Sequence, residues 1–189
     1  MKVLIACEFS GVVRDAFTNQ GHYAVSCDLL PTESPGKHYQ GDVLDIINNG
    51  WDLMIVFDPC TYQCNSGVRW LYERKDRWDK LYKSCKFTKT LLNADIDKIA
   101  RENPIPHKHA IKLIGKKYNQ IIQPWQFGHG ETKSTCLWLK NLPPLTPTNI
   151  VTGREHRIWK MPPSEDRSKL RSITFPGIAA AMAEQWGNL

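Results

Sequence analysis

KVLIACEFSGVVRDAF, residues 2–17, is the stretch that determines the class of fold. Its first residues form a short apolar run, which a polar pair and Gly11 then interrupt, as at the end of a buried strand. Apolar residues return at helical spacing at positions 12, 13, 16 and 17, so a helix follows the turn. Gly21 ends that helix, and residues 23–27 form a second short strand. This order predicts a βαβ unit with parallel strands.

The rest of the chain continues the alternation of strands and helices. Strands are expected at 41–43, 52–57, from 96 into Glu102, at 121–127 and at 135–139, the last two as a hairpin across 128–130. Helices are expected at 70–92, 107–117 and 177–186. We therefore predict one α/β domain over residues 1–189, Rossmann-like with a mostly parallel central sheet. Residues 141–174, rich in Pro and basic side chains, are expected to form an extended excursion from it.

Composition limits the function classes. The net charge of +6 favours a polyanionic partner, such as nucleic acid or a nucleotide. The chain is large enough to form a core without disulfides and shows no secretory signal, so we expect its six cysteines to be free thiols in a reducing, cytoplasmic compartment. The cysteines lack Cys-x-x-Cys spacing, so no metal site is expected. No apolar run approaches the roughly 20 residues of a membrane span, so a soluble protein without a membrane partner is expected.

Polar side chains follow each predicted parallel strand at the point where it ends. They are Glu8-Phe9-Ser10-Gly11, Asp28, Asp42, Asp58-Pro59-Cys60 and Glu102-Asn103-Pro104. In open parallel sheets, ligands bind beyond the carboxyl ends of the strands, so these residues predict one site.

The chemistry of these side chains narrows the ligand. An acid after the second strand, Asp28, suits the hydroxyls of a ribose. Only one glycine is present at the first turn where dinucleotide binders need three, which favours a smaller nucleoside cofactor. Cys60 is placed to be a nucleophile, and we expect helix amides near it that favour the thiolate. With Glu102 as the acid, this pair fits attack on a pyrimidine at carbon 6 with protonation of nitrogen 3.

These motifs resemble those of the DNA cytosine carbon-5 methyltransferase family in order and approximate spacing. The resemblance rests on Glu8-Phe-Ser-Gly11, Gly41-Asp42-Val43, Pro59-Cys60-Thr61 and Glu102-Asn103-Pro104. Residues 64–70, 123–130 and 135–138 are similar to stretches of compact phage or prophage proteins of this type, so that nearly the whole chain is covered. The resemblance implies a phage or prophage protein that acts in the cytoplasm of a bacterial host.

The resemblance also implies residue roles. The cofactor would be S-adenosylmethionine, with Asp28 on its ribose and Asp42 on its adenine. The other cofactor residues would be Glu8, Phe9, Ser10, Gly11, Leu29 and Pro59. Cys60 would be the nucleophile and Glu102 the acid, with Asp58 beside them. DNA contacts would come from Thr61, Asn65, Arg69, Lys133 and Thr135.

One region departs from the family and leaves the substrate open. Family members carry a long target-recognition region, where this chain has only 141–174. Single-stranded or short targets, a separate recognition partner, or a free nucleotide would each suit so small a surface.

Two other readings of the sequence remain open. The loop at Asp58 partly resembles the Asp-Pro-Pro-Tyr loop of amino methyltransferases, with Tyr62 as the stacking aromatic. The chain could also be a non-catalytic nucleic-acid-binding protein. That protein would use the basic residues at 69, 74, 75 and 77, or those at 154, 157 and 160.

Overall fold

Seven strands form one sheet in the order β3-β2-β1-β4-β5-β7-β6 in the computed structural model, which describes residues 1–189. The strands are β1 (Lys2–Ala6), β2 (Tyr23–Asp28), β3 (His38–Gln40), β4 (Leu53–Val56), β5 (Lys98–Pro104), β6 (Gln120–Ile122) and β7 (Thr135–Lys140). Only β7 runs antiparallel to its neighbours, and the other pairings are parallel. The expected mostly parallel, Rossmann-like α/β sheet is therefore confirmed, and its 3-2-1-4-5 part follows the doubly wound order.

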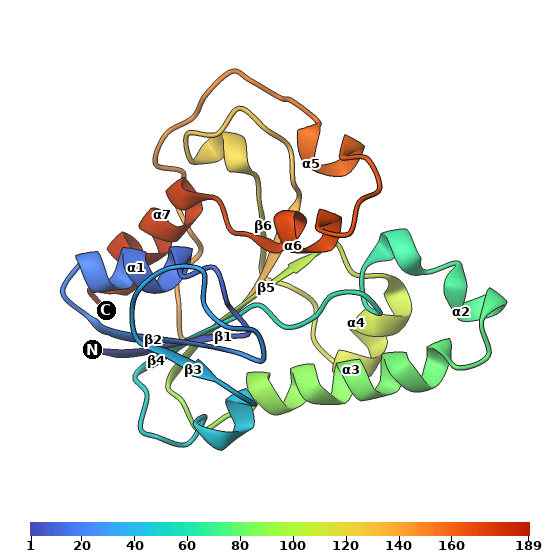
Figure 1. Ribbon diagram of the computed structural model, residues 1–189, viewed down its shortest axis with the longest axis horizontal. Coiled ribbons are helices and arrows are strands. Elements are labelled where there is room, and N and C mark those ends of the chain that lie inside the picture. The colour runs from blue at the N-terminus through green and yellow to red at the C-terminus, as the bar shows by residue number, and fades with distance from the viewer.

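Helices cover both faces of this sheet (Figure 1). They are α1 (Val12–Asn19), α2 (Trp70–Glu73), α3 (Arg77–Leu92), α4 (Lys108–Ile114), α5 (Arg157–Lys160), α6 (Arg167–Ser172) and α7 (Pro176–Trp186). Short 3₁₀ turns lie at η1 (Val43–Asp45), η2 (Asn65–Gly67) and η3 (Pro124–Gln126). None of the helices has the length and apolar character that crossing a membrane requires.

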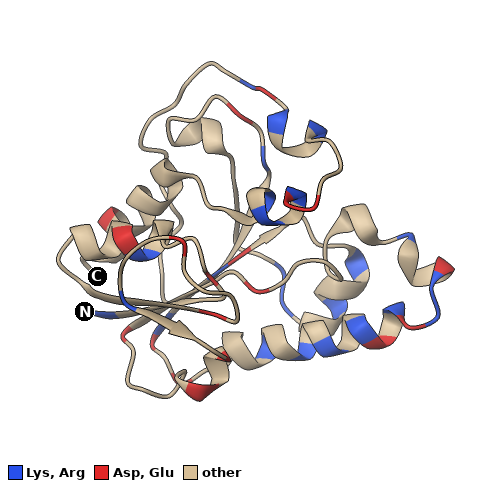
Figure 2. Cartoon of the chain, viewed as in Figure 1, with Lys and Arg blue, Asp and Glu red and all other residues tan.

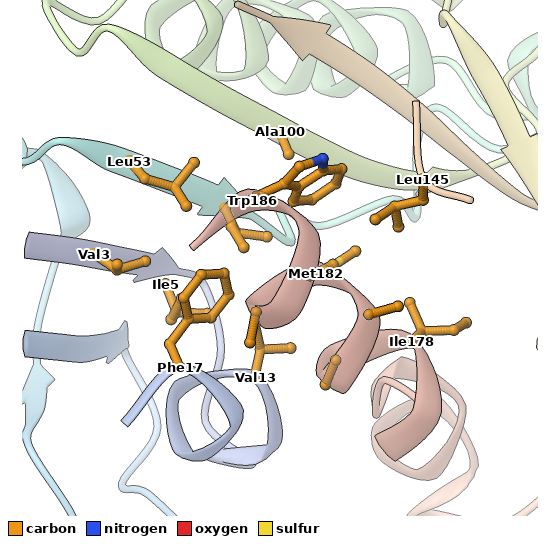
Figure 3. Packing of buried hydrophobic residues seen from close by; sticks show 14 of the residues in the cluster. Val3, Ile5, Val13, Phe17, Leu53, Ala100, Leu145, Ile178, Met182 and Trp186 are labelled. Atoms are coloured by element: carbon orange, nitrogen blue, oxygen red, sulfur yellow. The ribbon is translucent and has the colours of Figure 1, made fainter. Parts of the chain in front are cut away.

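The core is divided between the two faces of the sheet, because alternate residues of each strand point to opposite sides. On one face, α1 and α7 pack over the central strands. Phe17 lies there beside Ile5, and Trp186 lies near Leu53 and Ala100 (Figure 3). On the other face, Leu91 of α3 joins the second set of strand residues. Both faces of β1 and β4 are thus buried, as their continuous apolar runs predict.

The start of α7 packs so closely on the turn before β7 that it requires glycine. A Cβ atom at Gly177 would overlap the carbonyl oxygen of Phe127, and the Gly177 amide donates to His129 Nε2 at 2.9 Å. We expect Gly177→Ala to lower the free energy of unfolding by about 2 kcal/mol, the usual range for overpacking. Urea unfolding measures this. Ala180→Ser, on the exposed side of the same helix, should change stability by less than about 0.5 kcal/mol; equal effects would contradict the close-packing argument.

The structure differs from the sequence-based expectations at four places. The third strand lies at 38–40 and not at 41–43, because Asp42 instead caps η1 by accepting from the Leu44 amide at 3.0 Å. The helix expected at 70–92 is divided by the extended backbone of Arg74. The strand expected at 121–127 ends at 122, since Pro124 begins a 3₁₀ turn. The excursion at 141–174 contains two short helices, α5 and α6.

Candidate active site

A cavity of about 760 Å³ lies at the carboxyl ends of the central strands, within the size range of small-molecule sites. Its lining comes from the loops after β1 and β4, the end of β5, residues 132–134 and the segment 156–174. After β1 the chain continues to β2 on one side of the sheet, and after β4 it continues to β5 on the other side. The cavity therefore lies at the topological switch point, where open α/β sheets bind their ligands.

Glu8 brings a buried carboxylate to the cavity. Its Oε1 accepts from Ser10 Oγ at 2.7 Å and from the Val13 amide at 3.2 Å, while Oε2 has no hydrogen-bond partner. Burial raises the pKa of Glu8 above its ordinary value. An unpartnered oxygen of this kind is expected to accept a hydrogen bond from a ligand, since a buried polar group without a partner is costly.

Gly11 does not line the cavity, although it lies on the same loop. Its φ of 79° is in the left-handed region, where glycine is favoured. A Cβ at this position would lie 2.5 Å from Arg14 Nη2 and 2.8 Å from Ser34 Cβ. The buried Arg14 side chain donates to Ser26, Thr32 and the backbone of 34–35. The space beside Gly11 is thus filled by Arg14 and Ser34.

The loop after β4 carries two thiols that face the same cavity. The Cys64 amide donates to the Cys60 carbonyl at 3.0 Å, and this turn brings the thiols within hydrogen-bond reach of each other. The hydrogen bond from Cys60, with help from Ser66 and the Gly67 amide, lowers the pKa of Cys64 to about 5. The same hydrogen bond, together with burial, raises the pKa of Cys60. The expected thiolate-favouring environment at Cys60 is therefore wrong; Cys64 has it.

Asp58 lines the cavity, but its carboxylate is hydrogen-bonded to the side chains of Arg101 and Thr88. Arg101 Nε donates to Oδ1 at 2.5 Å and Arg101 Nη2 to Oδ2 at 3.1 Å. Thr88 Oγ1 adds a hydrogen bond to Oδ2 at 2.5 Å. Both side chains of the ion pair are buried, and the Arg101 guanidinium lies over the Trp138 ring. Both oxygens of Asp58 are thus taken up by the protein.

Glu102 reaches the cavity from the end of β5, next to β4 in the sheet. It is half-buried, and its Oε1 has no hydrogen-bond partner. Its charge is one of the lesser causes that raise the pKa of Cys60. The thiol and the carboxyl predicted to work together thus line one cavity.

The α5–α6 segment (residues 154–174) forms a wall of the cavity. Lys169 makes an ion pair with Glu33 and lies 5.5 Å from the centre of the Phe9 ring. Arg157 makes a second ion pair with Glu131 at 2.5 Å. These contacts fix both α5 and α6 to loops at the carboxyl ends of the strands. The excursion from the sheet therefore takes part in the site.

The structure brings together about half of the predicted site residues. Those that line the cavity are Glu8, Phe9, Ser10, Asp58, Pro59, Cys60, Thr61, Glu102 and Lys133. Those that lie outside its lining are Gly11, Asp28, Leu29, Asp42, Asn65, Arg69 and Thr135. Asp28 is the last residue of β2 and Leu29 follows it, so both lie at the carboxyl ends of the strands, as the cavity does. Leu29 is 73% exposed, and the Asp28 carboxylate accepts a hydrogen bond from the Leu30 amide. The predicted roles of all these residues remain predictions.

Several lining residues were not predicted from the sequence. Among them are Cys64, Trp70, Trp159 and Arg171. Cys64 has a sequence signal, its spacing of four residues from Cys60 on a turn-forming loop. The aromatic and basic residues are found only when the fold places their segments on the cavity. No cluster of three or more His, Cys, Asp or Glu side chains is placed to hold a metal ion.

No protein-family model and no curated protein matches the sequence. Similar folds were found among solved structures. The chain is similar to a structure described as a DNA modification methyltransferase encoded within an E. coli prophage, with a TM-score of 0.49 and 13% identity. That match covers 80% of this chain and 52% of the other. It is also similar to a methyltransferase of Entamoeba histolytica, with a TM-score of 0.49, 15% identity and coverages of 82% and 56%. The chain thus spans about half the length of each of these structures.

Proposed function

We propose that this protein is an S-adenosylmethionine-dependent methyltransferase that methylates carbon 5 of cytosine in DNA through an adduct on Cys60. The observation that carries the proposal is the meeting of Cys60 and Glu102 in one cavity at the switch point of the sheet. A nucleophilic thiol beside a proton donor is what activation of a pyrimidine ring requires. In this proposal the protein acts in the cytoplasm of a bacterial host.

The residues present fit the proposed cofactor. Its sulfonium and ammonium groups are cationic, and Glu8, which lines the cavity, has a carboxyl oxygen without a hydrogen-bond partner. The Glu8 loop leads into the N-terminus of α1, as in other nucleotide-binding α/β proteins. Phe9 and Pro59 add apolar surface on either side. When bound, the sulfonium would supply an electrophilic methyl group.

The side chains of the site then have the following tasks. The Cys60 thiol gives its proton to the Cys64 thiolate, and a bond forms between Cys60 sulfur and carbon 6 of cytosine. Glu102 gives a proton to nitrogen 3, which relieves the negative charge that this attack builds on the ring. After carbon 5 has received the methyl group, its proton passes to water. The sulfur–carbon bond breaks, nitrogen 3 returns its proton to Glu102, and Cys60 recovers its proton from Cys64.

The amino-methyltransferase reading is less well supported by the geometry. It needs a carboxylate at Asp58 that is free to bind an exocyclic amine, and both oxygens of this group accept hydrogen bonds from Arg101 and Thr88. Asp58→Ala would also leave Arg101 buried without its counter-charge, so a loss of activity in that variant would not separate a catalytic role from a structural one.

The product identifies the reaction without any variant. Cytosine-containing oligonucleotides, single-stranded and duplex, are incubated with the protein and methyl-labelled S-adenosylmethionine, and the nucleosides are separated after digestion. We expect label on carbon 5 of cytosine. Label on an exocyclic nitrogen would contradict the proposal in favour of an amino methyltransferase. Cofactor binding by calorimetry with no label on any base would favour the non-catalytic binding protein.

A further inference from the structure

The positive charge of the chain is concentrated on two segments. The α2–α3 segment (residues 69–89) has eight cationic and three acidic residues, and the α5–α6 segment has six and three. The whole chain has 25 cationic and 19 acidic residues, so the rest carries 11 and 13. An ordinary solvated surface would spread this excess over the molecule. Figure 2 shows the cationic residues gathered on these two segments.

The two segments lie on either side of the candidate active site. In Figure 1, α2 and α3 lie on one side of the sheet edge, and α5 and α6 lie on the other. The cavity connects them, because Trp70 and Arg77 line it from the first segment and Trp159 and Arg171 line it from the second. Each segment therefore brings one cation and one tryptophan to the lining of the site.

Each segment also presents a tryptophan with cations around it. The guanidinium carbons of Arg69 and Arg74 each lie 4.3 Å from the centre of a ring of the Trp70 indole. The Trp159 side chain is 57% exposed, beside the His156 ring and with Lys160 Nζ 5.7 Å from the indole. Large aromatic side chains interleaved with basic ones are typical of surfaces on which bases stack while cations contact phosphates.

We propose that the α2–α3 and α5–α6 segments together bind single-stranded nucleic acid, with unpaired bases stacked on Trp70 and Trp159 at the rim of the active site. This inference rests on the proposed function and names its substrate class. Stacking on an indole requires a base whose face is free, and bases inside a duplex do not offer one.

Binding is measured by fluorescence anisotropy with a labelled 12-residue DNA strand, the same strand as RNA, and its DNA duplex, all without S-adenosylmethionine. We expect the DNA strand or the RNA strand to bind at least about ten-fold more tightly than the DNA duplex. Trp70→Ala and Trp159→Ala should each weaken single-strand binding about ten-fold, which corresponds to about 1.4 kcal/mol for one stacked base. Lys160→Gln should lower the slope of log affinity against log salt by about 0.7.

Tyr23→Ala is the matched control. Tyr23 is 48% exposed and has Lys37 Nζ 3.7 Å from its ring centre. It is the first residue of β2, so it lies at the amino ends of the strands, whereas the cavity lies at their carboxyl ends. This variant should change binding less than two-fold. Tighter binding of the duplex, or equal effects of Tyr23→Ala and the two Trp variants, would overturn the proposal. Because the assay uses no cofactor, it is independent of methyl transfer: single-strand binding without transfer would contradict only the proposed activity.

Discussion

Replacing Cys60 with Ser should abolish methyl transfer, with a loss of at least about a thousandfold in single-turnover rate. A hydroxyl is a much weaker nucleophile than a thiol at neutral pH. The binding of S-adenosylmethionine, measured by calorimetry, should stay within a few-fold of the parent. Transfer to carbon 5 at a parental rate in Cys60→Ser would exclude the cysteine adduct.

The neighbouring thiol provides the matched variant. Cys64→Ser keeps the nucleophile but removes the proton acceptor, so transfer should slow by about a hundredfold and remain measurable. The pKa of Cys64 is lowered, so its thiolate is present at neutral pH and is lost as the pH falls toward about 5. Transfer by the parent should therefore decline on acidification, and Cys64→Ser should remove this limb of the profile. A separate test traps the covalent adduct with an oligonucleotide that contains 5-fluorocytosine, which has no removable proton on carbon 5. This oligonucleotide should stay covalently bound to the parent and to Cys64→Ser, but not to Cys60→Ser.

Replacing Arg101 with Met should lower the free energy of unfolding by about 3–5 kcal/mol, because it leaves the Asp58 charge buried without its partner. Arg101 is fully buried and donates to Asp58, Gln63 and Asn103 at once. Chemical unfolding followed by circular dichroism measures the loss. The double variant Arg101→Met with Asp58→Asn should recover part of it, since the unpaired charge is then gone.

The exposed ion pair of Arg157 and Glu131 is the control for this prediction. The Arg157 side chain is 58% exposed, so solvent screens the pair. Arg157→Met should cost less than about 1 kcal/mol. If Arg101→Met cost no more than Arg157→Met, the ion pair beneath the cavity would not be holding the ends of β4 and β5 together.

The sheet and the place of the site were predictable because both depend on local patterns. The apolar runs at 3–6 and 53–56 are typical of buried strands, and parallel strands bring the residues that follow them to one end of the sheet. Cys60 and Glu102 come together for this reason, although they are distant in sequence. The elements that were misplaced depend on single residues, such as the Asp42 cap and the extended Arg74.

The roles of individual side chains were harder to predict, since they depend on partners that a pattern does not reveal. The sequence shows that Asp58 follows β4, but it does not show that the Asp58 carboxylate is paired with the guanidinium of Arg101, 43 residues further along the chain. In the same way, Arg14 reads as an exposed helix residue, yet it is buried under the loop at 32–35. Trp159 lies in a segment with weak periodicity, and only the folded structure shows that it lines the cavity.

The buried pair of Asp58 and Arg101 also has a consequence for how this sequence can evolve. A lineage that lost one of the two charges would carry an unstable protein until a compensating substitution removed or replaced the other. The intermediate would be selected against, so the two positions should be inherited as a unit. Among natural relatives of this chain, we expect both charges or neither, and an aligned set of such sequences should show this covariation more clearly than at the exposed pair of Glu131 and Arg157.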